Sequence, residues 1–131
     1  MGGIGKTQLA LEYAHRYKSD YRIIWWVWSE VPASASTDFR LLARELGLEA
    51  GLNTPPEEIV YWVHRKLEQQ SGWLLIFDNA MDEQALAAFR PRGSAGHILI
   101  TSRSKELHTV GDTLKVEVLP REEAVAFLVS S

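Results

Sequence analysis

The stretch Gly2-Gly3-Ile4-Gly5-Lys6-Thr7 decides the fold. It matches the end of the phosphate-loop pattern G-x-x-x-x-G-K-[ST] and opens a helical pattern. Glycines let backbone N–H groups curl around a phosphate, and the positive end of the following helix attracts the same anion. Lys6 would place its charge on the β- and γ-phosphates, and the Thr7 hydroxyl would bind Mg²⁺. The stretch predicts a nucleotide site whose first glycine would precede Met1.

An isolated Gly-Lys-Thr could also be an ordinary turn with a solvated lysine, so a second motif matters. Leu74-Leu75-Ile76-Phe77-Asp78 follows about 70 residues later and has the continuous apolar character of a strand covered on both faces. An acid at the carboxyl end of such a strand can hold Mg²⁺. Buried strands ending in aspartate are common, but one that follows a phosphate loop predicts a metal site at Asp78.

A third element is Ile98-Leu99-Ile100-Thr101-Ser102-Arg103, a strand that delivers polar residues and an arginine to the same edge of the sheet. An arginine there can contact a γ-phosphate and report its presence. The alternative is a surface arginine at the start of a helix. We take Arg103 as a candidate catalytic residue beside Asp78.

The remaining pattern alternates strands with helices, which predicts βαβ units and a mainly parallel sheet in a three-layer α/β sandwich. A helix begins at Thr37 or Asp38 and ends at Gly47. Trp25, Trp26 and Trp28 lie on a strand, where burial explains them better than base stacking. The other expected helices cover residues 6–18, 56–70, 81–89 and 122–129, and the strands cover residues 22–28, 73–77, 97–101 and 114–119.

Composition narrows the class of protein. A length of 131 residues with 46% hydrophobic content fits one domain, residues 1–131. The net charge of −3, with no basic stripe, argues against nucleic acid as a direct partner. No cysteine is present, and the four histidines share no metal-binding spacing. No apolar run is long enough for a bilayer and no signal peptide is visible, so we expect a soluble cytoplasmic protein without a membrane partner.

Together these motifs resemble the NB-ARC family of STAND-class signalling ATPases, particularly bacterial members that carry tetratricopeptide repeats. The resemblance covers nearly the whole chain, through MGGIGKTQLALEYAHRY, IIWWVWSE, WLLIFDNAMD, HILITSRS and VEVLPREEAVAFL. It implies a P-loop NTPase fold that binds ATP or ADP with Mg²⁺ and acts as a switch. The implied phosphate-site residues are Gly3, Ile4, Gly5, Lys6, Thr7 and Gln8; Thr7 and Asp78 are the implied metal ligands, and Arg103 is the implied sensor.

The chain also departs from the family pattern. By this resemblance, we expect that the chain lacks the family's first strand and the segment that helps to hold adenine. We also expect that it lacks the downstream helical and winged-helix regions and the tetratricopeptide repeats of such relatives. We therefore expect an open slot between the strand at 97–101 and the last strand, with unpaired edges and low solubility. Asn79 stands where related ATPases often carry a catalytic acid.

Three hypotheses follow from these residues. The leading one is an ADP/ATP-binding switch module with slow or absent hydrolysis. The second is a non-functional fragment of such a domain. The third is a P-loop small-molecule kinase, which would need a lid of arginines, although Arg90, Arg92 and Arg121 are scattered along the chain.

Overall fold

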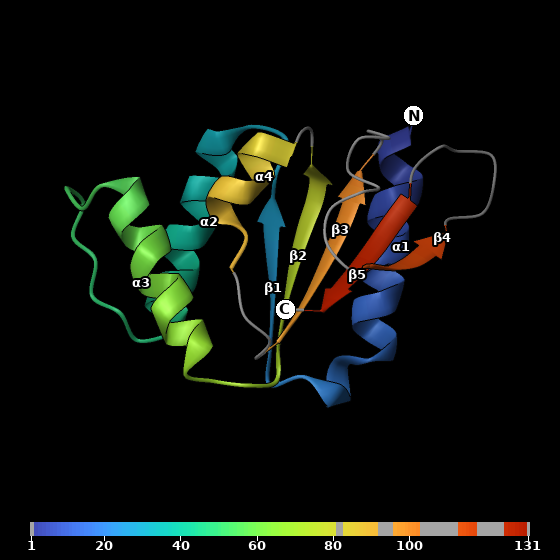
Figure 1. Cartoon of the computed structure of the whole chain (residues 1–131), viewed down its shortest axis with the longest axis horizontal. Helices are drawn as coiled ribbons and strands as arrows, with labels where there is room; N and C mark the ends of the chain where they lie inside the picture. The colour runs from blue at the N-terminus through green and yellow to red at the C-terminus, as the bar shows by residue number, and fades with distance from the viewer. Residues whose placement is uncertain (1, 81–82, 92–95, 103–112, 118–124, 131) are drawn as a thin grey trace.

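The structure is a computed structural model that describes residues 2–80, 83–91, 96–102, 113–117 and 125–130, with side chains described for residues 7–80, 84–91 and 96–102. Helices and strands alternate along much of the chain (Figure 1). The helices are α1 (Gly2–Arg16), α2 (Pro32–Glu45), α3 (Pro56–Glu68) and α4 (Glu83–Phe89), with a 3₁₀ turn at Lys18–Asp20. The strands are β1 (Ile23–Trp28), β2 (Trp73–Ala80), β3 (His97–Ser102), β4 (Thr113–Glu117) and β5 (Val125–Ser130).

The strands of the described chain form one five-stranded sheet in the order β1-β2-β3-β5-β4. Strands β1, β2 and β3 run parallel, which confirms the α/β class and the parallel core expected from the sequence. Strand β5 is antiparallel to both of its neighbours, β3 and β4. The parallel strands bring their carboxyl ends to one edge of the sheet, where ligands bind in open α/β folds.

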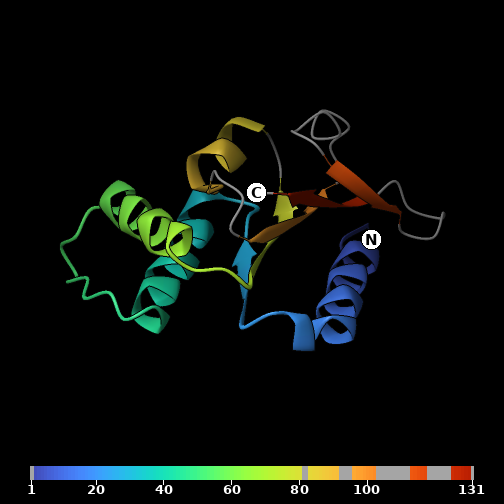
Figure 2. The same ribbon diagram turned by 60° about the horizontal axis from the view of Figure 1, so that its bottom comes forward.

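Alternate residues of β2 bury themselves on opposite faces of the sheet. Trp73, Leu75 and Phe77 belong to a core cluster with side chains of α2, α3 and α4. Leu74 and Ile76 belong to a second cluster, formed with α1. The two views show α1 on the opposite side of the sheet from the other helices, as a three-layer sandwich requires (Figures 1 and 2).

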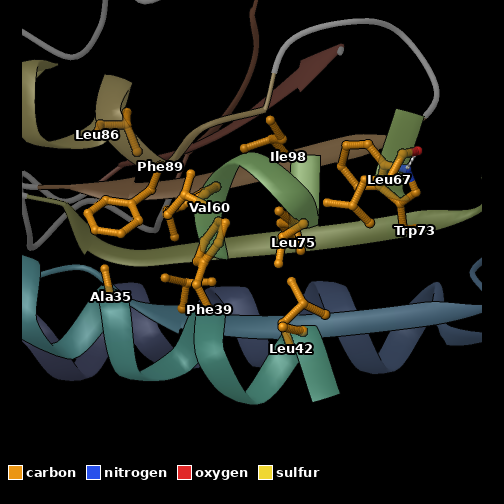
Figure 3. Close-up of a cluster of buried hydrophobic side chains, with 14 of the residues drawn as sticks. Ala35, Phe39, Leu42, Val60, Leu67, Trp73, Leu75, Leu86, Phe89 and Ile98 are labelled. Carbon is orange, nitrogen blue, oxygen red and sulfur yellow. Dashed lines mark hydrogen bonds between the residues drawn. The ribbon is translucent and has the colours of Figure 1, made fainter. Parts of the chain in front are cut away.

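The larger core is built around Phe39 of α2, which is fully buried. Its ring centroid lies 5.4 Å from that of Phe89 and 6.3 Å from that of Phe77, so it joins α4 to β2. At the other end of the same cluster, Trp73 packs beside Leu67 (Figure 3). The Trp73 Nε1–H donates to the carbonyl oxygens of Leu67 and Gln70 at 3.0 and 3.1 Å, which fixes the ring against the end of α3.

Helix α2 begins earlier than the sequence pattern predicted, at Pro32 instead of Thr37 or Asp38. Proline suits the first turn because its missing N–H has no partner there. Asp38 instead accepts a hydrogen bond from the Trp28 N–H at 2.8 Å and so ties the helix to β1. The end at Gly47 is confirmed: its φ of 84° closes a Schellman motif that a side chain would strain.

Burial accounts for only some of the tryptophans in β1. Trp25 and Trp26 are half-buried, and the Trp25 Nε1–H donates to the Asp38 carbonyl at 3.0 Å. Trp28 is 39% exposed, so the expectation that all three are buried was wrong for this residue. The physical reason is position, because β1 is an edge strand and Trp28 is its last residue.

Helix α1 begins at Gly2, so the glycine-rich stretch is helical where the sequence pattern predicted a loop before residue 6. Glycine in a helix is less stable than alanine by about 1 kcal/mol per residue. Three of the first four residues of α1 are glycines. The glycines therefore make the first turn less stable than a turn built from alanine.

The expected helix at 122–129 is wrong, because residues Val125–Ser130 form β5. This strand pairs with β3 along its length, from His97↔Ser130 to Ser102↔Val125, and β4 pairs with its other edge. The slot expected beside β3 is thus filled by the chain's own C-terminal strand, and the expected low solubility loses its basis. An unpaired edge in the sheet interior would leave a row of backbone groups without partners, which β5 avoids.

In the described ranges, no helix is both long enough and apolar enough to cross a membrane.

The strand assignment of Val125–Ser130 can be tested by NMR on the labelled chain. We expect ¹³Cα shifts below random-coil values and slow amide exchange, because β5 is hydrogen-bonded on both sides. Residues Pro56–Glu68 of α3 provide the helical reference, with shifts above random coil. Positive ¹³Cα deviations across residues 125–130 would instead support the helix expected from the sequence.

The contact between Gly96 and Trp73 gives a stability prediction. A Cβ atom at Gly96 would overlap the Trp73 ring, which the surrounding core and two hydrogen bonds hold in place. Gly96→Ala should lower the free energy of unfolding by about 1–3 kcal/mol in urea titrations. Gly51→Ala is the matched control, since its nearest atom would lie 3.9 Å away, and it should change stability by less than about 0.5 kcal/mol. Equal stability of the two variants would show that the Trp73 ring is free to move.

Candidate functional site

The candidate site is centred on Asp78, near the carboxyl end of β2. Its side chain is fully buried. The Thr7 hydroxyl of α1 donates to Asp78 Oδ2 at 3.0 Å, and the Thr101 hydroxyl of β3 donates to Oδ1 at 2.5 Å. Three elements that are far apart in the sequence therefore meet at one carboxylate.

Packing of α1 on the sheet places Thr7 at this point. Ala10, one turn after Thr7, is fully buried against Leu74, Ile76 and Leu99. Residues three apart lie on the same helix face, so the contact that buries Ala10 also turns Thr7 towards the end of the strands. The sequence predicted that Thr7 and Asp78 would share a site, and the structure brings them into hydrogen-bond contact.

An irregularity in β2 shapes the site. Phe77 pairs with Ile100 and Ala80 with Ser102, so Asp78 and Asn79 together face Thr101, as in a β-bulge. Asn79 has a φ of 63°, a left-handed conformation that asparagine, aspartate and glycine adopt most readily. The Asn79 N–H donates to Thr101 Oγ1 at 2.9 Å. The bulge bends β2 where its side chains reach the edge of the sheet.

The electrostatics of Asp78 are unusual. Among the side chains that the structure describes, its carboxylate contacts two hydroxyls, and neither carries a positive charge. Buried charges in proteins are normally paired with an opposite charge or bound to a metal ion. Within the described part of the chain Asp78 has only neutral donors, and such an environment is suited to receive a cation.

The nature of the donors indicates which cation fits. No group of three or more histidine, cysteine, aspartate or glutamate side chains gathers within the described residues, which disfavours an all-protein metal cage there. Mg²⁺ typically binds through one or two carboxylates, a hydroxyl, phosphate oxygens and several waters. Thr7 and Asp78 supply that carboxylate and hydroxyl and leave the other positions to ligand and solvent.

The other expected site residues are only partly described. Gly3, Ile4, Gly5 and Lys6 lie in the first turns of α1, and their side chains fall outside the described residues. Gln8 is exposed on the same helix. Arg103 lies outside the described residues altogether, so its expected sensor role stays a prediction.

Thr101 and the backbone of Asn79 are the parts of the site that sequence reasoning missed. The sequence showed only that β3 ends in polar residues, and Thr101 proves to be fully buried. A buried threonine at the end of an apolar strand needs a hydrogen-bond partner. That requirement could have identified Thr101 from the sequence. Its partner is the carboxylate that the sequence had already singled out.

A second polar cluster lies at the opposite ends of the strands. The Tyr21 hydroxyl lies 2.7 Å from His97 Nδ1 and 3.4 Å from the Tyr13 hydroxyl. Burial, with the hydrogen bond to Tyr13, raises the pKa of Tyr21 above its usual range, so the phenol stays protonated at neutral pH. The cluster ties the end of α1 to the start of β3.

The whole chain matches a known protein family. The NB-ARC domain family matches residues 1–131, the whole chain. The chain belongs to the NB-ARC domain family.

A relative of this NB-ARC domain is similar in sequence. It is a nucleotide-binding leucine-rich repeat (NLR)-like protein of Hyaloscypha variabilis, 25% identical over 154 aligned residues. The alignment covers 100% of this chain and 16% of the relative, so the domain spans a small part of the relative's length. No solved structure matches the chain significantly. The bacterial, tetratricopeptide-associated subtype expected from the sequence stays a prediction.

The burial of Asp78 predicts that its carboxylate lowers the stability of this NB-ARC domain when no cation is bound. In Mg²⁺-free, nucleotide-free buffer, Asp78→Asn should raise the free energy of unfolding by about 1 kcal/mol or more, because it removes a buried charge whose donors among the described side chains are all neutral. Chemical denaturation measures the change. Asp38→Asn is the control, because that half-buried carboxylate accepts one backbone N–H at the surface and its variant should shift stability by less than about 0.5 kcal/mol. A clear loss of stability in Asp78→Asn would mean that the protein itself supplies a counter-charge.

Proposed function

We propose that this NB-ARC domain binds ADP or ATP together with Mg²⁺ and serves as the nucleotide-dependent switch of a STAND-type signalling protein. The observation that carries the proposal is the hydrogen bond between Thr7, the last residue of the phosphate-loop motif, and the buried Asp78. The two residues lie 71 positions apart in the sequence. Their contact joins the two motifs that nucleotide binding requires.

Each element of the site has a proposed role. Thr7 and Asp78 would hold Mg²⁺, which offsets phosphate charge when it is bound. Lys6 would contact the β- and γ-phosphates, and the amides of Gly3, Ile4, Gly5 and Gln8 would surround the phosphate chain. Gly3, Ile4 and Gly5 lie in the first turn of α1, whose N–H groups have no partner within the helix and can bind an anion.

Hydrolysis is proposed to be slow or absent. The residue after Asp78 is Asn79, whose amide cannot take a proton from an attacking water. Its φ of 63° gives a separate, structural reason for asparagine at this position. Arg103 is proposed as a γ-phosphate sensor that offsets part of the missing charge stabilisation. A domain that binds nucleotide without consuming it holds its state, which suits a switch.

The long relative supports further proposals about the surroundings of the domain. Its printed description includes nucleotide binding and leucine-rich repeats, and this chain aligns with 16% of it. We propose that the domain acts with an upstream strand, with downstream helical and winged-helix regions, and with a repeat region, for which tetratricopeptide repeats are our candidate. A cytoplasmic location is part of the same proposal.

Two other functions can be separated from this one by experiment. A non-functional fragment would bind no nucleotide. A P-loop small-molecule kinase would transfer phosphate to an acceptor in solution and would need arginines from a closing lid. Neither has an observation in its favour that compares with the Thr7–Asp78 contact.

Nucleotide binding is tested with a fluorescent ADP analogue in Mg²⁺ buffer. Charged hydrogen bonds are worth about 1.5–3 kcal/mol, so Lys6→Ala should weaken binding by about tenfold or more. Addition of EDTA should also weaken binding to the wild type. Lys18→Ala is the matched control, since this exposed lysine lies just beyond the opposite end of α1. No binding to the wild type at millimolar nucleotide would favour the non-functional fragment, and equal affinities of the two lysine variants would remove Lys6 from the site.

Turnover is tested in single-turnover assays with radiolabelled ATP. We expect near-background hydrolysis by the wild type, because a missing general base costs about 10²–10⁴-fold in rate. Asn79→Asp should raise the rate, since aspartate tolerates the same left-handed backbone. Asp78→Ala serves as the variant without the proposed metal ligand. Brisk wild-type hydrolysis that Asp78→Ala abolishes would overturn the proposed role of Asn79.

A further inference from the structure

Thr101 makes two hydrogen bonds whose directions are fixed. The Asn79 N–H can only donate, so Thr101 Oγ1 must accept at that contact, where the distance is 2.9 Å. The hydroxyl proton of Thr101 is then available for Asp78 Oδ1, at 2.5 Å, and an ionised carboxylate can only accept it. One hydroxyl therefore holds both residues of the β2 bulge.

Burial gives these bonds their weight. Thr101 and Asp78 are both fully buried, so solvent does not replace a lost partner easily. Ser102, the next residue, fastens the far side of the bulge by donating to the Ala80 carbonyl at 2.8 Å. The Thr101 hydroxyl donates to the Asp78 carboxylate, whereas the Ser102 hydroxyl donates to a backbone carbonyl of the bulge.

The two oxygens of Asp78 thus have different tasks. Thr101 occupies Oδ1, and Thr7 of α1 contacts Oδ2. Because Thr101 belongs to the buried strand β3, it fixes the rotation of the carboxylate from the sheet side. The oxygen that faces α1 is then aimed before any ligand arrives.

We infer that Thr101 is a positioning residue for cation binding: its hydroxyl locks the β2 bulge and orients Asp78 so that Oδ2 faces Thr7. This inference rests on the proposed Mg²⁺–nucleotide function of the same site. Residues that orient a metal ligand typically change metal affinity by about 10- to 100-fold when they are removed. Thr101 should therefore affect the Mg²⁺ requirement of ADP binding more than the contacts to ADP itself.

The test compares Thr101→Val, which keeps the shape of the side chain and removes its hydroxyl, with Thr101→Ser, which keeps the hydroxyl. Two quantities are measured: the Mg²⁺ concentration at half-maximal binding of the fluorescent ADP analogue, and the affinity for that analogue in EDTA. We expect Thr101→Val to raise the Mg²⁺ requirement by about tenfold or more, with its affinity in EDTA within about twofold of the wild type. Thr101→Ser should stay close to the wild type in both. Thr101→Ala replaces Thr101→Val if the valine variant does not fold, since it differs from the serine variant by one oxygen atom.

Ser102→Ala is the matched control, because it removes the neighbouring buried hydroxyl, which donates to the Ala80 carbonyl. It should leave the Mg²⁺ requirement unchanged even where it lowers thermal stability. The inference is overturned if Thr101→Val has the wild-type Mg²⁺ requirement, or if Ser102→Ala raises that requirement as much. It is also overturned if Thr101→Val weakens binding equally with and without Mg²⁺.

A readout without nucleotide separates this inference from the proposed function. If the wild type binds no ADP, the proposed function fails, and amide hydrogen exchange at Asn79 then tests the lock itself. Exchange there should be at least about tenfold faster in Thr101→Val than in the wild type or Thr101→Ser, because the N–H loses its buried acceptor. Equal exchange rates in the three proteins would rule out Thr101 as the residue that holds the bulge.

Discussion

The carboxylate of Asp78 is buried where β2 ends, and the arrangement of the site follows from the need to satisfy it. Two hydroxyls, from α1 and β3, converge on its two oxygens. Both donors come from elements that pack on or within the parallel sheet, so the hydrophobic core fixes the positions of the polar groups. These two described donors are neutral, so they satisfy hydrogen bonding without cancelling the negative charge of Asp78, which a bound cation would do.

The parallel core and the principal site residues could be predicted from the sequence because their signals are local. A continuous apolar run marked β2, the acid at its end marked Asp78, and the phosphate-loop pattern marked Thr7. The bulge could not be predicted, because an apolar run does not show where two residues of β2 pair with a single residue of β3. Asn79 was interpreted through the chemistry of its amide, whereas its left-handed backbone gives a second reason for its identity. Thr101 escaped notice because its role depends on the register of β3 against β2.

The C-terminal segment shows where tertiary context overrides a local pattern. Residues 125–130 read Val-Ala-Phe-Leu-Val-Ser, a short apolar run that fits either a helix or a buried strand. Strand β3 lies in the sheet interior and requires hydrogen-bond partners on both edges, and β5 provides them on the side away from β2. Six residues are too few for their periodicity to distinguish a helix from a strand. The strand forms because β3 needs a hydrogen-bond partner on that edge. The start of α1 is a related case, in which glycines expected in a loop continue a helix that packs on the sheet.

The proposed switch would need a rigid part that recognises nucleotide and a part that can rearrange. The Asp78–Thr101 contact is buried in the sheet, whereas the first turn of α1 is weakened by its glycines. We propose that Thr7 and Asp78 together hold a divalent cation beside the nucleotide. The most direct measurement is a crystal structure of the domain with Mn²⁺ and ADP, with the metal located by anomalous scattering. The account predicts an anomalous peak beside the Thr7 hydroxyl and the Asp78 carboxylate; bound ADP with its Mn²⁺ away from both residues would contradict it.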